Sequence, residues 1–149
     1  MELMTRDFGK VDIDQNEVIK FTQGLPGFEN YREYVLLTLP GPNPFFILQS
    51  VEEQELAFIT VDPWEVVSGY EVNINDGDKS FLKITNKEEV LILVIGTIHE
   101  ELSDMTVNLA APLIINVRAK LGKQIILEES GYAVRQPIFS QEAKEQVVK

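Results

Sequence analysis

The chain has 149 residues, of which 44% are hydrophobic and 25% are charged, and this balance is typical of one globular domain and not of a disordered chain. The formal net charge of −11 disfavours direct binding to nucleic acid, because contacts to phosphates need clustered lysine and arginine. The absence of cysteine excludes disulfides and thiolate chemistry and suits a reducing compartment.

The chain shows no segment that predicts export or membrane insertion. Its longest apolar run, residues 90–95, is too short to cross a bilayer. The first seven residues, MELMTRD, lack the basic start and the apolar stretch of a signal peptide. We therefore expect a cytoplasmic protein that does not contact a membrane.

Most of the sequence reads as short β segments separated by turn residues, which predicts a mainly β protein. We expect a small antiparallel β-barrel or sandwich-like single domain over residues 1–139, with few short helices. The expected strands are residues 11–13, 18–21, 34–39, 45–50, 56–61, 70–74, 81–84, 90–98, 107–109, 113–117, 123–127 and 132–137.

The segment Phe21-Thr22-Gln23-Gly24-Leu25-Pro26-Gly27-Phe28-Glu29, called the shaped loop below, sets two glycines and a proline between aromatic residues. Gly24 and Gly27 can adopt backbone angles closed to other residues, and Pro26 fixes its own angle and biases Leu25 towards an extended conformation. The pattern predicts a stiff surface loop with a defined shape. The plainer interpretation is a turn that only reverses the chain.

Three further segments carry local signals. Asp62 and Pro63 predict the start of a short helix over residues 63–67. The run Asn75-Asp76-Gly77-Asp78 resembles a calcium loop but lacks the glutamate that completes one, so we interpret it as a hairpin turn. Residues 140–149 predict a frayed tail or a short helix.

The run VLILVI at residues 90–95 is the best core candidate, because it does not alternate between apolar and polar residues. Both faces of that strand are therefore expected to be covered.

Charge is uneven along the chain. Residues 1–60 hold four basic and ten acidic residues, residues 61–105 hold three and ten, and residues 106–149 hold six and four. A surface built from the first two segments would attract a basic protein. Acidity that only maintains solubility is the plainer interpretation.

Residues for catalysis or cofactor binding are not apparent. The single histidine, His99, precedes two glutamates and reads as an exposed loop residue. No serine elbow, dinucleotide fingerprint or phosphate-binding loop is present, so we expect no enzyme activity, metal or cofactor. An OB-like nucleic-acid-binding barrel would need a basic groove, for which Arg118, Lys120 and Lys123 are the candidates.

An ordered set of segments resembles the flagellar assembly factor FliW family over about residues 11–137. After the shaped loop these are FFILQS at 45–50, LAF at 56–58, Asp62-Pro63, Tyr70, TVNLAAPLIIN at 106–116 and Gly122-Lys123-Gln124. The resemblance implies a bacterial cytoplasmic protein that binds flagellin and also antagonises CsrA, the RNA-binding repressor of flagellin translation. The alternative is a flagellin-specific chaperone without a translational role.

The expected partner contacts fall into two groups. The shaped loop and its flank supply Phe28, Glu29 and Tyr31, and an acidic patch for the repressor would contain Glu71, Asp76 and Asp78. The patch could compete with RNA, as acidity suggests, or dock beside the RNA-binding face, as the resemblance to non-competitive antagonists implies. Thr106, Asn108 and Asn116 also match the family, and we expect them mainly to satisfy buried backbone groups.

Overall fold

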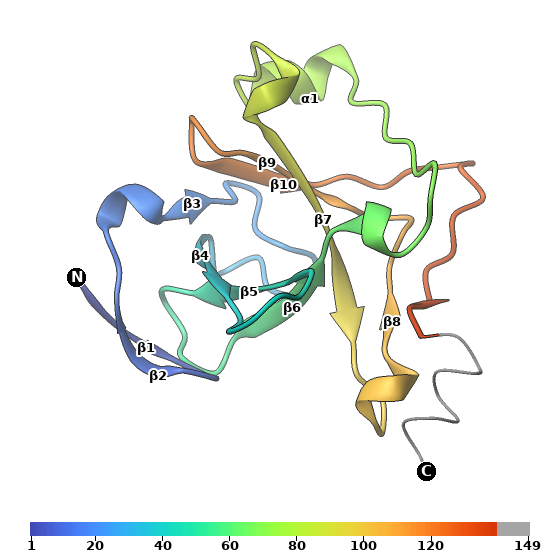
Figure 1. Cartoon of the computed structure of the whole chain (residues 1–149). Helices are drawn as coiled ribbons and strands as arrows, with labels where there is room; N and C mark the ends of the chain where they lie inside the picture. Colours follow the sequence, from blue (N-terminus) through green and yellow to red (C-terminus); the bar gives the residue numbers. More distant parts are fainter. Residues whose placement is uncertain (140–149) are drawn as a thin grey trace.

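The computed structural model describes residues 1–139 and is mainly β (Figure 1). Its strands are β1 (Glu2–Thr5), β2 (Gly9–Asp12), β3 (Ile19–Lys20), β4 (Glu33–Thr38), β5 (Phe45–Ser50), β6 (Ala57–Val61), β7 (Val90–Thr97), β8 (Thr106–Val107), β9 (Leu113–Asn116), β10 (Leu121–Gln124) and β11 (Gln136–Pro137). The helices in this part of the chain are α1 (Asp76–Phe81) and the 3-10 turns η1 (Gln15–Glu17), η2 (Pro63–Glu65), η3 (Lys87–Glu89) and η4 (Leu102–Asp104). The expected mainly β fold is confirmed.

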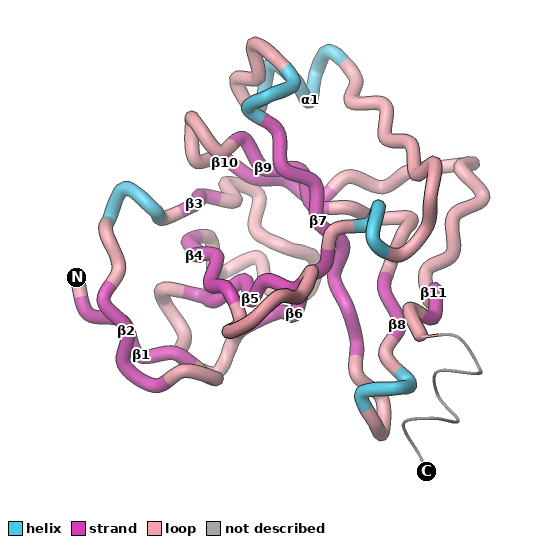
Figure 2. The backbone as a smooth tube through the Cα atoms, viewed as in Figure 1, coloured by secondary structure: helices cyan, strands magenta, loops and turns pink. Residues whose placement is uncertain are grey.

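Seven strands close into a barrel in the order β7, β6, β5, β4, β3, β10 and β9, and β9 pairs again with β7 (Figure 2). Neighbouring strands are antiparallel except β3 and β10, which pair in parallel where Lys20 meets Leu121. Strands β8 and β11 extend the sheet from the second half of β7. The hairpin of β1 and β2 forms a separate two-stranded sheet.

Strand β7 is covered on both faces at Leu93 and Val94, as the unbroken apolar run predicted. Its first half pairs with β9, and its second half pairs with β6 and then with β8. Leu93 and Val94, whose side chains lie on opposite faces of the strand, are both 0% exposed. Each belongs to a different hydrophobic cluster, so β7 is the wall between two cores.

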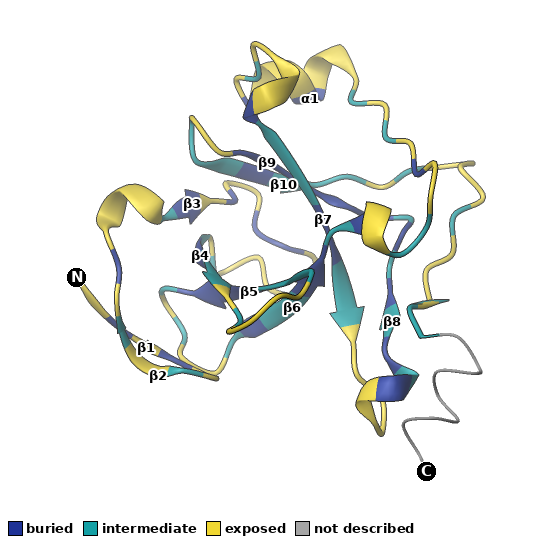
Figure 3. Ribbon diagram, viewed as in Figure 1, coloured by how far each residue is buried: buried dark blue, intermediate teal, exposed yellow. Residues whose placement is uncertain are grey.

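The two hydrophobic cores on either side of β7 contain different residues and lie in different parts of the molecule. The barrel core contains Phe21, Tyr34, Leu48 and Leu93, and the ring of Phe21 meets that of Tyr34 edge to face at 5.4 Å. The second core lies between β7, β8 and the long connection after β6, and it includes Tyr70. The hydroxyl of Tyr70 donates a 2.6 Å hydrogen bond to the Leu109 carbonyl, and burial raises the pKa of Tyr70 to about 12. Figure 3 shows this burial along the barrel strands, whereas α1 is mostly exposed.

Two expected strands, residues 70–74 and 81–84, are wrong. Val72 and Ile74 are partly buried without pairing to a strand, so their alternation reflects packing alone. The expected hairpin turn at Asn75 is also wrong, because the Asn75 side chain accepts a hydrogen bond from the Asp78 backbone N–H and caps α1. The sequence analysis missed β1, whose Leu3 packs in one buried cluster with Ile13 and with Val35 of β4.

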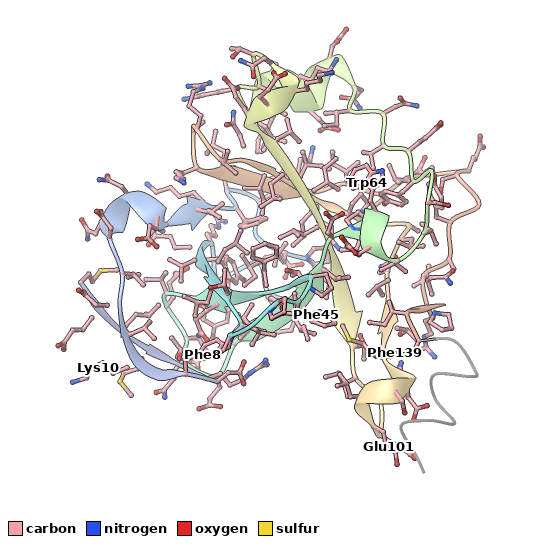
Figure 4. The ribbon with its side chains drawn as sticks, viewed as in Figure 1. Phe8, Lys10, Phe45, Trp64, Glu101 and Phe139 are labelled. Atoms are coloured by element: carbon pink, nitrogen blue, oxygen red, sulfur yellow. The ribbon has the colours of Figure 1, made fainter. Side chains whose placement is uncertain are left out.

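The short helix begins where Asp62 and Pro63 predicted it, although it is the 3-10 turn η2 and ends at Glu65. The Asp62 carboxylate accepts a hydrogen bond from the Trp64 N–H at 2.9 Å. Trp64, labelled in Figure 4, stacks edge to face on Tyr70 and remains 46% exposed. The prediction for residues 140–149 lies outside the described residues.

Glu89 joins the end of η3 to the turn after β9. Hydrogen bonds from the Thr85 hydroxyl and the Thr85 backbone N–H, together with Arg118 at 2.8 Å, lower the pKa of Glu89 to about 2. A lowered pKa stabilises the fold above the ordinary value of 4.5, and this contribution is lost as the pH falls towards 2. We expect Glu89→Gln to lower the urea midpoint at pH 7 and the difference from wild type to shrink below pH 4.5. A difference in urea midpoint between wild type and Glu89→Gln that stays the same at every pH would contradict this role of Glu89.

Candidate functional site

The shaped loop is built from three successive hydrogen-bonded turns. The N–H groups of Gly24, Phe28 and Tyr31 donate to the carbonyls of Phe21, Leu25 and Phe28 at 2.7, 2.7 and 3.0 Å. The middle turn has Pro26 and Gly27 at its centre, and the positive φ of 87° at Gly27 fits a type II turn. The loop therefore has the defined shape that the sequence predicted.

The backbone at Gly24 lies close to the backbone at Glu29, which restricts the shape of the loop. Gly24 is buried with φ of 68°, and a Cβ at this position would lie 2.6 Å from the Glu29 Cα. The Glu29 carboxylate accepts a 3.0 Å hydrogen bond from the Gly27 N–H, which lowers the pKa of Glu29. Phe28 packs edge to face on Phe58 of β6 at 5.3 Å, so the loop is anchored to the barrel.

Replacing Gly24 tests this rigidity. We expect Gly24→Ala to lower the free energy of unfolding by about 2–4 kcal/mol, because it adds a clash with backbone to the cost of a positive φ. Gly27→Ala is the matched control, since its φ is also positive but its Cβ would enter open space, and it should cost about 1–2 kcal/mol. If chemical denaturation gives the same loss of unfolding free energy for both variants, the close approach of Gly24 to Glu29 does not contribute to stability.

Beside the shaped loop lies a groove of about 400 Å³, which we call the neutral groove. Its walls include Leu25, Phe58, His99, Ile126, Val134 and Arg135. Among the described residues, no aspartate or glutamate lines it. The Nε2 atom of His99 lies 3.0 Å from the Thr106 hydroxyl, so these two polar residues of the groove contact each other.

A second groove of about 310 Å³, the acidic groove, lies near the N-terminal end of α1. The carboxylates that line it belong to Glu71, Asp78 and Glu128. Glu71 and Glu128 are exposed, and the Glu71 backbone N–H donates to the Tyr132 hydroxyl at 2.8 Å. The groove therefore offers two accessible negative charges on an anchored backbone.

Asp78 differs from the other carboxylates of the acidic groove. Its side chain is 11% exposed and pairs with Lys123 at 2.6 Å, and Lys123 also lies 5.2 Å from the centre of the Phe81 ring. Its charge is largely neutralised within the protein. Asp78 therefore joins α1 to β10, and a lysine there would oppose Lys123 and disturb the fold.

The structure brings together some residues of each of the two groups of partner contacts that the sequence predicted. Phe28 and Tyr31 pack against the barrel, and Phe28 supports Phe58 in the wall of the neutral groove. Glu71 and Asp78 share the acidic groove, whereas Asp76 is exposed and does not line it. Sequence reasoning missed Ile126, Glu128, Val134 and Arg135, which come from segments read only as strands or solvated charges.

A ridge formed by residues 125–127 separates the two grooves. The N–H groups of Ile125 and Leu127 donate to the carbonyls of Pro112 and Ala110 at 2.9 and 2.8 Å, which holds the ridge against the barrel. Between these two bonds, Ile126 is 64% exposed and lines both grooves. The grooves therefore share one apolar wall.

The remaining polar candidates have structural roles. The buried Asn116 donates to the carbonyls of Leu82 and Lys83 and accepts from the N–H groups of Arg118 and Ala119, as expected. In the basic cluster, Arg118 pairs with Glu89 and Lys123 with Asp78. Within residues 1–139, no three histidine or carboxylate side chains are grouped to hold a metal ion.

No helix within the described part of the chain is both long and apolar enough to span a membrane.

Comparison with known proteins gives one consistent family. The sequence model described as "FliW protein" matches residues 2–138. The chain is 37% identical over 144 residues to the "Flagellar assembly factor FliW" of Clostridium tetani, covering 97% of this chain and 99% of the relative. It is 39% identical over 139 residues to that of a Geobacillus species, covering 93% and 96%. A solved structure described as "Crystal structure of the flagellar assembly factor FliW" superposes with a TM-score of 0.89 at 35% identity, covering 95% of this chain and 99% of that one.

Proposed function

The chain belongs to the FliW family of flagellar assembly factors, and we propose that it binds flagellin and antagonises a CsrA-type RNA-binding repressor by exchanging one partner for the other. Flagellin retained in the cell occupies this protein and leaves the repressor free to act. Export of flagellin releases this protein, which then binds the repressor and lifts the repression of translation. Mass action drives this exchange if the two bindings exclude each other.

The acidic groove is the observation that carries the regulatory half of the proposal. A repressor that binds RNA must present lysine and arginine to phosphates. Glu71 and Glu128 offer exposed carboxylates to such a surface, and the adjacent exposed Asp76 adds to the negative field. The attraction between these charges speeds encounter and weakens as salt increases.

Direct RNA binding by an OB-like barrel is less well supported. Of the three cations that such a groove would use, Arg118 and Lys123 already pair with carboxylates. Lys120 alone is too little positive charge to hold a nucleic acid strand against a net charge of −11.

The test follows the anisotropy of a labelled flagellin leader RNA bound to CsrA, with this protein and then flagellin added at two salt concentrations. We expect the protein to release the RNA, high salt to weaken that effect and flagellin to reverse it. Repeating the titration at several RNA concentrations distinguishes two ways of releasing RNA. If this protein competes for the RNA-binding face of the repressor, excess RNA overcomes its effect. If it docks beside that face, excess RNA does not. A flat signal from a protein that still binds flagellin would leave the flagellin-specific chaperone as the function.

A further inference from the structure

The residues that line the neutral groove differ in charge from the acidic composition of the whole chain. The sequence has 24 acidic and 13 basic residues, yet none of the described residues that line this groove is an aspartate or glutamate. Its one permanent cation is Arg135, which is exposed and forms no ion pair within residues 1–139. A guanidinium that pairs with no carboxylate of residues 1–139 is complementary to a carboxylate from a partner.

The rest of the groove is suited to apolar side chains. Ile126 and Val134 are 64% and 63% exposed, and they face a space also walled by Leu25 and Phe58. Apolar groups left exposed around one hollow mark an interaction site more often than scattered ones do. Its volume of about 400 Å³ is in the range of small-ligand pockets, so it holds a few side chains of a segment and not a folded domain.

We propose that the neutral groove receives an apolar segment of flagellin with a carboxylate opposite Arg135, and that Ile126, its wall shared with the acidic groove, makes this occupancy incompatible with repressor binding. The assignment rests on the proposed function, because it places that function's two partners on two surfaces. The neutral groove takes the partner recognised by apolar contact and one arginine. The acidic groove takes the partner recognised by its basic surface.

The shared ridge gives a physical reason for exclusion. Ile126 lies between two residues whose backbone N–H groups are hydrogen-bonded to the barrel, and its side chain lines both grooves. A partner that covers Ile126 from one side removes that surface from the other. Exclusion therefore needs no large conformational change in the barrel.

The experiment measures binding of labelled flagellin and of the CsrA-type repressor, each separately, to the full chain and its variants. Val134→Asp and Arg135→Glu are expected to weaken flagellin binding at least tenfold, because each puts a negative charge where the segment is apolar or acidic. Neither variant should change repressor affinity by more than about twofold. Ile126→Ala should weaken both partners several-fold, since it truncates the shared wall.

Lys10→Glu is the matched control for Arg135→Glu, because it makes the same charge reversal on β2, across the barrel from β11 (Figure 2), and the label in Figure 4 marks its place. It should leave both affinities unchanged. Wild-type flagellin affinity in both Val134→Asp and Arg135→Glu, with normal melting curves, would overturn the groove assignment while the proposed function stands. An effect of Ile126→Ala on one partner only would overturn the shared wall. A wild-type protein that binds no flagellin would overturn both the groove assignment and the proposed function.

Discussion

Leu93→Asp is expected to unfold the protein at 25 °C. Leu93 is 0% exposed in the barrel core, and β7 pairs there with Leu113 of β9. Truncating a buried leucine to alanine alone costs about 2–5 kcal/mol, and burying an unpaired carboxylate adds several more. That sum is comparable to the whole stability of a domain, which is about 5–15 kcal/mol.

Circular dichroism and a thermal melt measure this outcome directly. Leu102→Asp is the matched control, because Leu102 is 54% exposed in η4 and the same substitution there should leave the melt nearly unchanged. A cooperative melt for Leu93→Asp close to that of wild type would contradict the assignment of Leu93 to the barrel core.

The double variant Glu71→Lys and Glu128→Lys is expected to weaken repressor binding about tenfold or more. Both carboxylates are exposed and line the acidic groove, so lysine replaces attraction by repulsion without entering the core. The dependence of affinity on salt should become flatter, because the favourable long-range charge interaction is lost. Flagellin binding should be retained.

The matched control is Glu55→Lys with Glu100→Lys, which makes the same charge change at two exposed residues outside both grooves. This control separates a local effect of the groove from a general effect of net charge. Equal repressor affinity in the two double variants would remove the acidic groove from the proposal. Asp78 is left intact in both, because its ion pair with Lys123 supports the fold.

The arrangement of the two grooves relates the fold to the proposed exchange. Residues 125–127 continue from β10, and their backbone bonds to residues 110 and 112 hold them beside β9. The barrel thus supplies a rigid ridge between a neutral and an acidic surface. Two partners of different chemistry can then be recognised within a short distance.

Local sequence patterns predicted the parts of the fold that depend on neighbouring residues. The strand at residues 45–50, the cap at Asp62 and the turn at Pro26-Gly27 follow from side-chain periodicity and backbone restriction, which act over a few residues. The segments at 70–74 and 81–84 were misread for the same reason. Residues 70–74 alternate because of packing and lack a partner strand, whereas residues 81–84 form the end of α1 and a turn in which Lys83 has a φ of 56°.

The sequence by itself determined the mainly β class, the unbroken core run at β7, the rigid loop and the acidic character of the first two-thirds of the chain. Only the tertiary structure decided which side chains share a surface. Barrel closure pairs β3 with β10 and brings Glu128 beside Glu71, and it places Lys123 against Asp78. Such contacts join residues dozens of positions apart, and whether a carboxylate is free or neutralised depends on those distances and not on its sequence neighbours.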